Sequence, residues 1–179
     1  WQPSAVVCDM DTLRTEAPRG FSSALAEVIK TGLIGDASLL DLVERELDGI
    51  LAREPSALTE VVRRSVRVKA RIVGLDEREA GLRAVLNLGH TVGHALETLG
   101  KYAALTHGEA VSLGLVAALR IGERRRVTPS ELTRRVVALL HRAGLPTDLA
   151  THDLRAAGNL VGHDKKRAGD GIRFVLAVA

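Results

Sequence analysis

The sequence predicts a mainly α-helical protein, a helical bundle with a short strand near each end of the chain. The prediction rests on apolar residues that recur at helical spacing along most of the chain, and on prolines and capping residues that separate the helical segments. The 179 residues are 46% hydrophobic and 26% charged, a balance typical of a folded domain rather than a disordered chain. We therefore expect one helical domain over residues 1–179.

The boundaries of the helices follow from local signals. Asp36 can cap the second helix, and Pro55 fits the first turn of the third. Residues 128–131 have the spacing of a capping box with Pro129 at the first helical position, and residues 144–146 end the helix that follows. We expect helices at residues 18–34, 37–52, 55–73, 86–99, 108–126, 129–143 and 152–161.

Two short apolar runs predict strands, and one helix predicts the centre of the bundle. Residues 4–9 are typical of a short buried strand, and residues 171–176 of a second strand. The helix at 108–126 is apolar on every side, so we expect it to be buried among the other helices. His107 directly precedes it and should lie at the start of this central helix.

Charge and cysteine content exclude several classes of protein. The 25 basic and 22 acidic residues leave a net charge of +3, the arginines are spread over many segments, and only 2% of residues are aromatic, which argues against a nucleic-acid-binding surface. The single cysteine, Cys8, excludes an internal disulfide and a Cys-x-x-Cys zinc site. No apolar run approaches the ~18 residues that span a bilayer, and residues 1–4 do not begin a signal peptide, so we expect a soluble, cytoplasmic protein.

The clearest chemical motif lies in residues 86–97. Histidines at positions i and i+4 can bind one metal ion, but the same pattern also occurs on a solvated polar face. Gly89 and Gly93 are costly inside a helix, so they predict the close approach of backbone or of a ligand. One face of this predicted helix carries Asn87, His90, His94 and Glu97.

Lys69 lies in the middle of the apolar face of helix 55–73, away from the arginines of that helix. A lysine can extend its apolar stem to solvent at the end of a helix. Because this position is central, the pattern favours a side chain that points into a ligand cleft.

Three other groups have no decisive pattern of their own. Glu27 and Lys30 fit an exposed ion pair one helical turn apart. His107 can be a helix cap or a ligand, and residues 164–166, Asp-Lys-Lys, fit a surface turn in a glycine-rich loop.

Seven separated motifs, taken in order, closely resemble the C-terminal half of 3-dehydroquinate synthase. They are residues 26–30, 67–69, 76–83, 86–91, 94, 107–111 and 164–166. Residues 2–6 and 13–15 also resemble the family, so the resemblance covers essentially the whole chain. It implies the helical metal- and substrate-binding domain of that fold.

The resemblance also implies a metal site, with zinc or cobalt bound by Glu27, His90 and His107. We prefer this set to the simple His90–His94 pair, because one glutamate and two histidines leave positions open for a substrate, as at a catalytic zinc. The groups implied to bind the carboxylate, hydroxyls and phosphate of the substrate are Lys30, Lys69, Arg83, Asn87, His94, Lys165 and Lys166. Between the last two lysines the resemblance does not choose.

The reaction implied is that of a carbon–oxygen lyase, which converts 3-deoxy-arabino-heptulosonate 7-phosphate to 3-dehydroquinate and phosphate in the shikimate pathway of aromatic amino-acid biosynthesis. The family uses NAD, held mostly by an N-terminal α/β domain, and this chain contains no Gly-x-Gly-x-x-Gly fingerprint. We therefore expect such a domain as partner, no activity from the 179 residues alone, and at most a weak NAD contact at Thr15, where residues 15–24 depart from the family pattern. A homodimer is compatible with the sequence.

Three alternatives stay open at this point. A related sugar-phosphate cyclase that makes a deoxy-inosose or a valiolone would share fold and metal. A metal-dependent alcohol or glycerol dehydrogenase has a similar two-domain plan but matches the motifs less well. A non-catalytic structural or interaction module derived from this domain would keep the fold without turnover.

Overall fold

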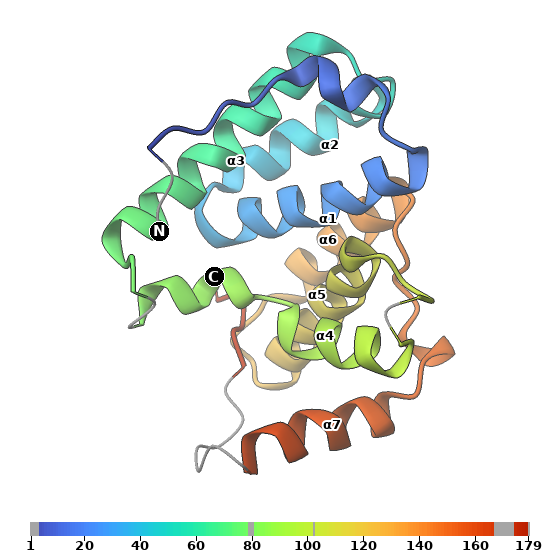
Figure 1. Cartoon of the computed structure of the whole chain (residues 1–179). Helices are drawn as coiled ribbons and strands as arrows, with labels where there is room; N and C mark the ends of the chain where they lie inside the picture. The colour runs from blue at the N-terminus through green and yellow to red at the C-terminus, as the bar shows by residue number, and fades with distance from the viewer. Residues whose placement is uncertain (1–3, 79–80, 102, 167–173, 179) are drawn as a thin grey trace.

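The computed structural model describes residues 4–78, 81–101, 103–166 and 174–178, and it is built from helices (Figure 1). The α-helices are α1 (Pro18–Gly35), α2 (Ala37–Leu51), α3 (Pro55–Leu75), α4 (His90–Leu99), α5 (His107–Arg124), α6 (Ser130–Arg142) and α7 (Leu154–Lys166). Three short 3₁₀ segments are η1 (Met10–Arg14), η2 (Leu82–Asn87) and η3 (Leu149–Thr151). Within this described part, no helix has both the length and the apolar character needed to cross a membrane.

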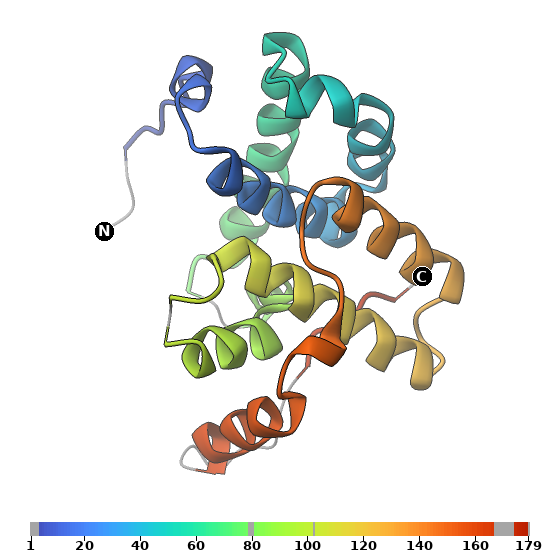
Figure 2. The same ribbon diagram turned by 90° about the vertical axis from the view of Figure 1, so that its right-hand side faces the viewer.

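The helices form two groups that meet along α1 and α5. In Figure 1, α1, α2 and α3 lie together in the upper half, α4, α5 and α7 lie below them, and α6 lies partly behind α1. Helix α1 packs against α2, α3, α5 and α6, and α5 packs against α1, α4 and α6. Residues 110–119 of α5 are all buried, which confirms the prediction of a central helix. The view in Figure 2 shows α7 at the edge of the molecule, where it packs on α4.

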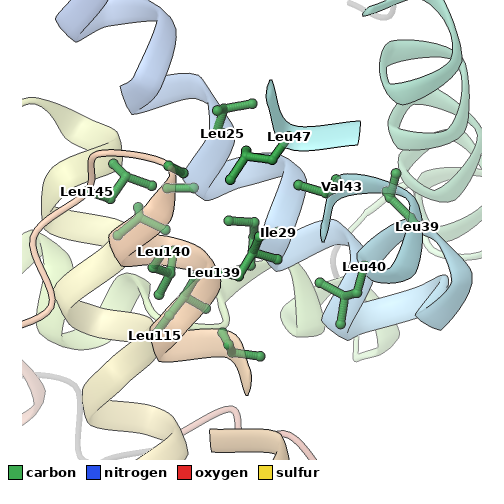
Figure 3. Close-up of a cluster of buried hydrophobic side chains, with 14 of the residues drawn as sticks. Leu25, Ile29, Leu39, Leu40, Val43, Leu47, Leu115, Leu139, Leu140 and Leu145 are labelled. Atoms are coloured by element: carbon green, nitrogen blue, oxygen red, sulfur yellow. The ribbon is translucent and has the colours of Figure 1, made fainter. Parts of the chain in front are cut away.

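The main core lies between α1, α2 and α6, with α5 behind them (Figure 3). Ile29 of α1 and Leu115 of α5 are fully buried. Full burial of such a side chain stabilises a fold by about 1.5–3 kcal/mol, so this cluster contributes to holding the two groups of helices together. Other labelled members of the cluster are Leu25, Leu39, Leu40, Val43, Leu47, Leu139, Leu140 and Leu145.

Local signals at the helix starts are mostly confirmed. The Asp36 carboxylate accepts a hydrogen bond from the Leu39 amide at 3.2 Å and caps α2, and Pro55 is the first residue of α3. The capping box expected at residues 128–131 is wrong, because Pro129 is itself the N-cap residue of α6. The Thr128 hydroxyl instead donates to the backbone carbonyl of Ala177 and ties down the end of the chain.

The two terminal strands are also wrong for the residues that the structure describes. Residues 4–9 are not in a strand, and Val6 and Val7 are 72% and 90% exposed. Residues 174–176 are likewise not in a strand, and residues 171–173 lie outside the described part. A strand needs a neighbouring strand to satisfy its backbone hydrogen bonds, and the described residues supply none for either segment.

Two helix boundaries differ from the predicted ones by more than two residues. The helix expected from residue 86 begins at His90, because Gly89 has a left-handed backbone with φ of 80° and separates it from η2. Helix α7 continues past residue 161 to Lys166, so residues 164–166 form its last turn rather than a loop. The side chains of residues 163–166 lie outside the described part.

The glycines of the His90 motif allow two backbones to approach closely. A Cβ at Gly93 would lie 3.0 Å from the Ala110 carbonyl oxygen on α5. A Cβ at Gly114 would lie 1.8 Å from the Gly89 carbonyl oxygen, well inside contact distance. Of the two explanations left open for these glycines, backbone packing is therefore the one observed.

Gly114→Ala should destabilise the fold by more than about 3 kcal/mol, because neither backbone atom in the clash can move without separating α4 from α5. The matched control is Gly158→Ala in α7, where nothing lies within 4 Å of the new Cβ. That change should stabilise by about 0.4–1 kcal/mol. Urea denaturation of both variants measures the difference, and equal effects would contradict the packing described here.

Candidate metal centre

Three side chains from three helices converge at the junction of α1, α4 and α5. Glu27 comes from the middle of α1, and His90 and His107 are the first residues of α4 and α5. The Glu27 Oε1 atom lies 3.6 Å from His90 Nε2 and 3.7 Å from His107 Nε2. Two donors bound to one tetrahedral zinc at about 2.0–2.2 Å lie roughly 3.4 Å apart, so this spacing fits a single metal ion.

The two oxygens of the Glu27 carboxylate have different surroundings. Oε2 lies 2.7 Å from the ammonium of Lys30, which is only 4% exposed. Oε1 is buried and has no hydrogen-bond partner among the described residues. A buried carboxylate oxygen without a partner is costly, and here it faces two imidazole nitrogens, so the donor set fits a cation. The simple reading of Glu27 and Lys30 as an exposed ion pair is wrong, because Lys30 is buried.

Hydrogen bonds on the far side of each imidazole orient both rings. His90 Nδ1 lies 3.2 Å from the backbone carbonyl oxygen of Leu88, and His107 Nδ1 lies 3.2 Å from Glu97 Oε1. Both acceptors require a proton on Nδ1, which leaves the Nε2 lone pairs free toward Glu27. Burial lowers the pKa of His90, and the positive charge of Lys30 lowers it further, so the neutral form that binds metals is favoured.

His94 lies beside these groups but is not in the same donor set. Its ring centroid is 5.1 Å from that of His90 and 6.0 Å from that of His107, and the side chain is exposed. A second set of donors joins His94, Glu97 and His107. Glu97 already accepts from His107 there, whereas Glu27 Oε1 has no partner, so the set with Glu27 and His90 fits a metal better.

The start of α5 is held next to α1 by two polar contacts. The Arg19 guanidinium donates to both carboxylate oxygens of Glu109 at 2.7 Å, and Glu109 completes a capping box with Thr106. The hydrogen bonds from Arg19 lower the pKa of Glu109. The Gly108 amide donates to the Ser23 hydroxyl at 2.9 Å, and a Cβ at Gly108 would lie 1.8 Å from the Ser23 carbonyl oxygen. The first residue of α5 is therefore positioned by its neighbours on both sides.

The remaining predicted substrate groups come from α3, η2 and α7. Lys69 is exposed on α3, which packs against η2, and no described residue forms an ion pair or hydrogen bond with its side chain. Arg83 is half-buried in η2 and donates from Nη1 to the Glu77 carbonyl at 2.9 Å. Asn87 is exposed at the end of η2. The side chains of Lys165 and Lys166 lie outside the described part.

Thr15, the predicted NAD contact, is exposed at the end of η1, where its hydroxyl donates to the Thr12 carbonyl. Glu97, for which the sequence motifs predict no role, is 8% exposed and contacts His107. Its signal was present in the sequence, since Glu97 lies on the same face of α4 as His94 and one turn after it.

Comparisons with known proteins agree with the family motifs. The family model described as 3-dehydroquinate synthase C-terminal matches residues 24–167. Over 176 residues the chain is 45% identical to a 3-dehydroquinate synthase of Acidithiobacillus ferrooxidans. The matched region covers 98% of this chain and 48% of that protein. The 3-dehydroquinate synthase of Geobacter metallireducens is 43% identical over 98% of this chain and 49% of its own length. This chain spans about half the length of the curated relatives it matches.

Solved structures share the fold at lower identity. The 2-epi-5-epi-valiolone synthase of Streptomyces hygroscopicus, with NAD⁺ and Zn²⁺ bound, has a TM-score of 0.80 at 24% identity and covers 89% of this chain and 44% of its own. A 2-deoxy-scyllo-inosose synthase complexed with carbaglucose-6-phosphate, NAD⁺ and Co²⁺ has a TM-score of 0.79 at 24% identity, over 95% of this chain and 47% of its own. Both the family match and the sequence identity to the curated relatives show that the chain belongs to the 3-dehydroquinate synthase family and corresponds to its C-terminal domain.

Proposed function

We propose that this chain is the metal- and substrate-binding half of a 3-dehydroquinate synthase. The proposed reaction eliminates phosphate from 3-deoxy-arabino-heptulosonate 7-phosphate and closes the ring to 3-dehydroquinate, a step of the shikimate pathway, with NAD and one divalent metal, zinc or cobalt. The observation that carries the proposal is the buried, unpartnered Glu27 Oε1, which faces the Nε2 atoms of His90 and His107. The metal would be held by these three residues.

The part of the relatives that this chain does not match is the proposed source of most NAD contacts. The solved relatives bind NAD⁺ together with Zn²⁺ or Co²⁺, and this sequence has no dinucleotide-binding fingerprint. We therefore propose that the NAD-binding domain completes the active site and that Thr15 lies near the boundary between the two parts.

A divalent metal held by Glu27, His90 and His107 would polarise a substrate oxygen and so make the neighbouring C–H bond more acidic. The residues of this chain prepare for that chemistry in separate ways. Lys30 neutralises one oxygen of Glu27 and holds the carboxylate in place, and burial keeps His90 neutral. His94 is exposed beside the ligands, at a position from which its imidazole can hydrogen-bond a phosphate oxygen or exchange a proton.

The cationic side chains are proposed to bind the carboxylate and the phosphate of the acidic substrate. The planar guanidinium of Arg83 suits a bidentate bond to a carboxylate, and Lys69, Lys165 and Lys166 supply positive charge for phosphate. Asn87 offers an amide that can donate to or accept from a substrate hydroxyl. Four of the five lysines in this arginine-rich chain have a proposed ligand role; Lys101 is the exception.

A related sugar-phosphate cyclase is the second candidate, because two solved members of that group share the fold. The likeness at 24% identity is one of fold alone, whereas the identity to 3-dehydroquinate synthases reaches 45% over nearly the whole chain. We therefore favour the heptulosonate phosphate as substrate.

A chimera tests the proposed reaction. Residues 1–179 should replace the matching half of the Acidithiobacillus ferrooxidans relative without loss of NAD- and metal-dependent phosphate release from the heptulosonate phosphate. The 179 residues alone should release no phosphate and show no saturable NAD binding below millimolar concentration in calorimetry. A folded, metal-loaded chimera that uses another sugar phosphate from a substrate panel instead would assign the chain to the other cyclases. Lack of turnover with every substrate would support a non-catalytic module.

The metal site itself gives a second prediction. The purified chain should bind about one equivalent of Co²⁺ or Zn²⁺, and Glu27→Gln, His90→Ala and His107→Ala should each reduce the bound metal to near zero. His94→Ala is the matched control and should retain most of the metal. Metal content after dialysis measures all four variants, and equal loss in His90→Ala and His94→Ala would restore the pair suggested by helical spacing.

Lys69→Met tests the proposed substrate contact. Because Lys69 is exposed, the variant should change the free energy of unfolding by no more than about 0.5 kcal/mol. Activity in the chimera should fall at least 100-fold, since a charged contact to the anionic substrate is lost. A stability loss above about 2 kcal/mol with unchanged activity per folded molecule would show that Lys69 is structural.

A further inference from the structure

Glu97, a buried carboxylate on α4, is neither a proposed metal ligand nor a proposed substrate group, yet it contacts one of the ligands. Glu97 has a side chain that is 10% exposed, and its Oε1 lies 3.2 Å from His107 Nδ1. A carboxylate rarely occupies such a position without a partner, because burial of the charge is costly. Among the described residues, His107 is the partner that the structure shows for it.

The contact determines which nitrogen of His107 carries its proton. An ionised carboxylate only accepts hydrogen bonds, so the Nδ1 atom that faces Glu97 must carry the proton. The Nε2 atom then presents a lone pair toward Glu27 Oε1, 3.7 Å away. His90 is oriented in the same sense by the Leu88 carbonyl, but that acceptor is backbone, so the His107 contact is the one that a side-chain substitution can remove.

The close packing of α4 and α5 makes this geometry rigid. Glu97 is one turn after Gly93 on α4, and Gly93 packs directly on the backbone of α5 near its start. His107 has a side-chain exposure of 49%, so the surrounding protein encloses only about half of its side chain. The hydrogen bond to Glu97 is therefore a main restraint on the ring.

We infer that Glu97 is a positioning residue of the metal centre, which fixes the His107 tautomer and ring orientation and so raises the affinity for the metal. The inference rests on the proposed metal site at Glu27, His90 and His107. Carboxylates that hydrogen-bond metal-ligating histidines typically contribute 10–100-fold to metal affinity.

The experiment compares Co²⁺ affinity in the wild-type chain, Glu97→Gln and Glu97→Leu, by competition with a chelator. We expect Glu97→Gln to weaken binding about tenfold, because the amide still reaches Nδ1 without the charge, and Glu97→Leu about 100-fold. Glu131→Gln is the matched control, since it removes the same charge from an exposed side chain of α6. It should leave the Co²⁺ affinity at the wild-type value. Circular dichroism establishes that each variant is folded, and Glu97→Gln keeps the inference testable if Glu97→Leu does not fold.

A second measurement separates positioning from a general structural role. In the metal-free wild type at pH 8, ¹⁵N NMR of the histidine side chains should place the His107 proton on Nδ1, and Glu97→Leu should shift it partly to Nε2. The His90 signal should be the same in both proteins, because its acceptor is the Leu88 carbonyl.

Each contrary outcome is distinct. If the wild type binds metal and both Glu97 variants bind it within twofold of wild type, the inference is wrong while the metal site stands. If Glu97→Gln abolishes binding as fully as Glu27→Gln, Glu97 is itself a ligand and the positioning role is wrong. If the wild type binds no metal, the proposed function fails first, and an Nε2 proton on wild-type His107 would overturn the inference on its own.

Discussion

The close approach of α4 and α5 sets the positions of the groups around which the site is built. Glycine at 89, 93 and 114 removes the side chains that would otherwise separate the two helices. Their first residues, both histidines, then lie near each other, with ring centroids 5.3 Å apart. Gly108 allows the same kind of approach between α5 and α1, and it thereby brings Glu27 to the two histidines. The candidate metal ligands therefore lie where α1, α4 and α5 approach one another closely at glycine residues.

The charges at this junction are balanced in a way that suits a divalent ion and an anionic ligand. Glu27 and Glu97 contribute two negative charges, and Lys30 contributes one positive charge. The cluster without a cation therefore carries a net charge of −1, which a divalent cation changes to +1. A small positive charge at the centre favours a phosphate or a carboxylate nearby, and the exposed His94 lies next to His90.

Much of the fold could be predicted because it depends on local signals. Apolar period, Asp36 and Pro55 mark helix boundaries that the structure reproduces within a residue or two. The start of α4 could not be placed, since the left-handed turn at Gly89 depends on contact with α5 rather than on neighbouring residues. The terminal strands failed for a similar reason. An apolar sequence such as residues 4–9 indicates that a strand can form, but no described residue supplies a partner strand for it.

Only part of the candidate site could be predicted from helical spacing in the sequence. Helical spacing relates residues on one helix, so it could pair His90 with His94 but not with Glu27 on α1 or His107 on α5. The family motifs supplied that set. Spacing also predicted a surface pair for Glu27 and Lys30, because the spacing of residues along one helix does not reveal that Lys30 is buried in the folded chain. Glu97 was visible as a polar residue on the right face of α4, yet its role depends on the first residue of another helix.

The arrangement of the three ligands on α1, α4 and α5 also bears on folding. A cation bound by all three would join segments that are distant in the sequence, and it would act as a reversible cross-link between the two groups of helices. Two of the donors are the first residues of their helices, the positions at which helices unwind most readily. Metal occupancy would thus oppose unwinding at both helix starts, and the stability of the domain would follow the free metal concentration of its surroundings.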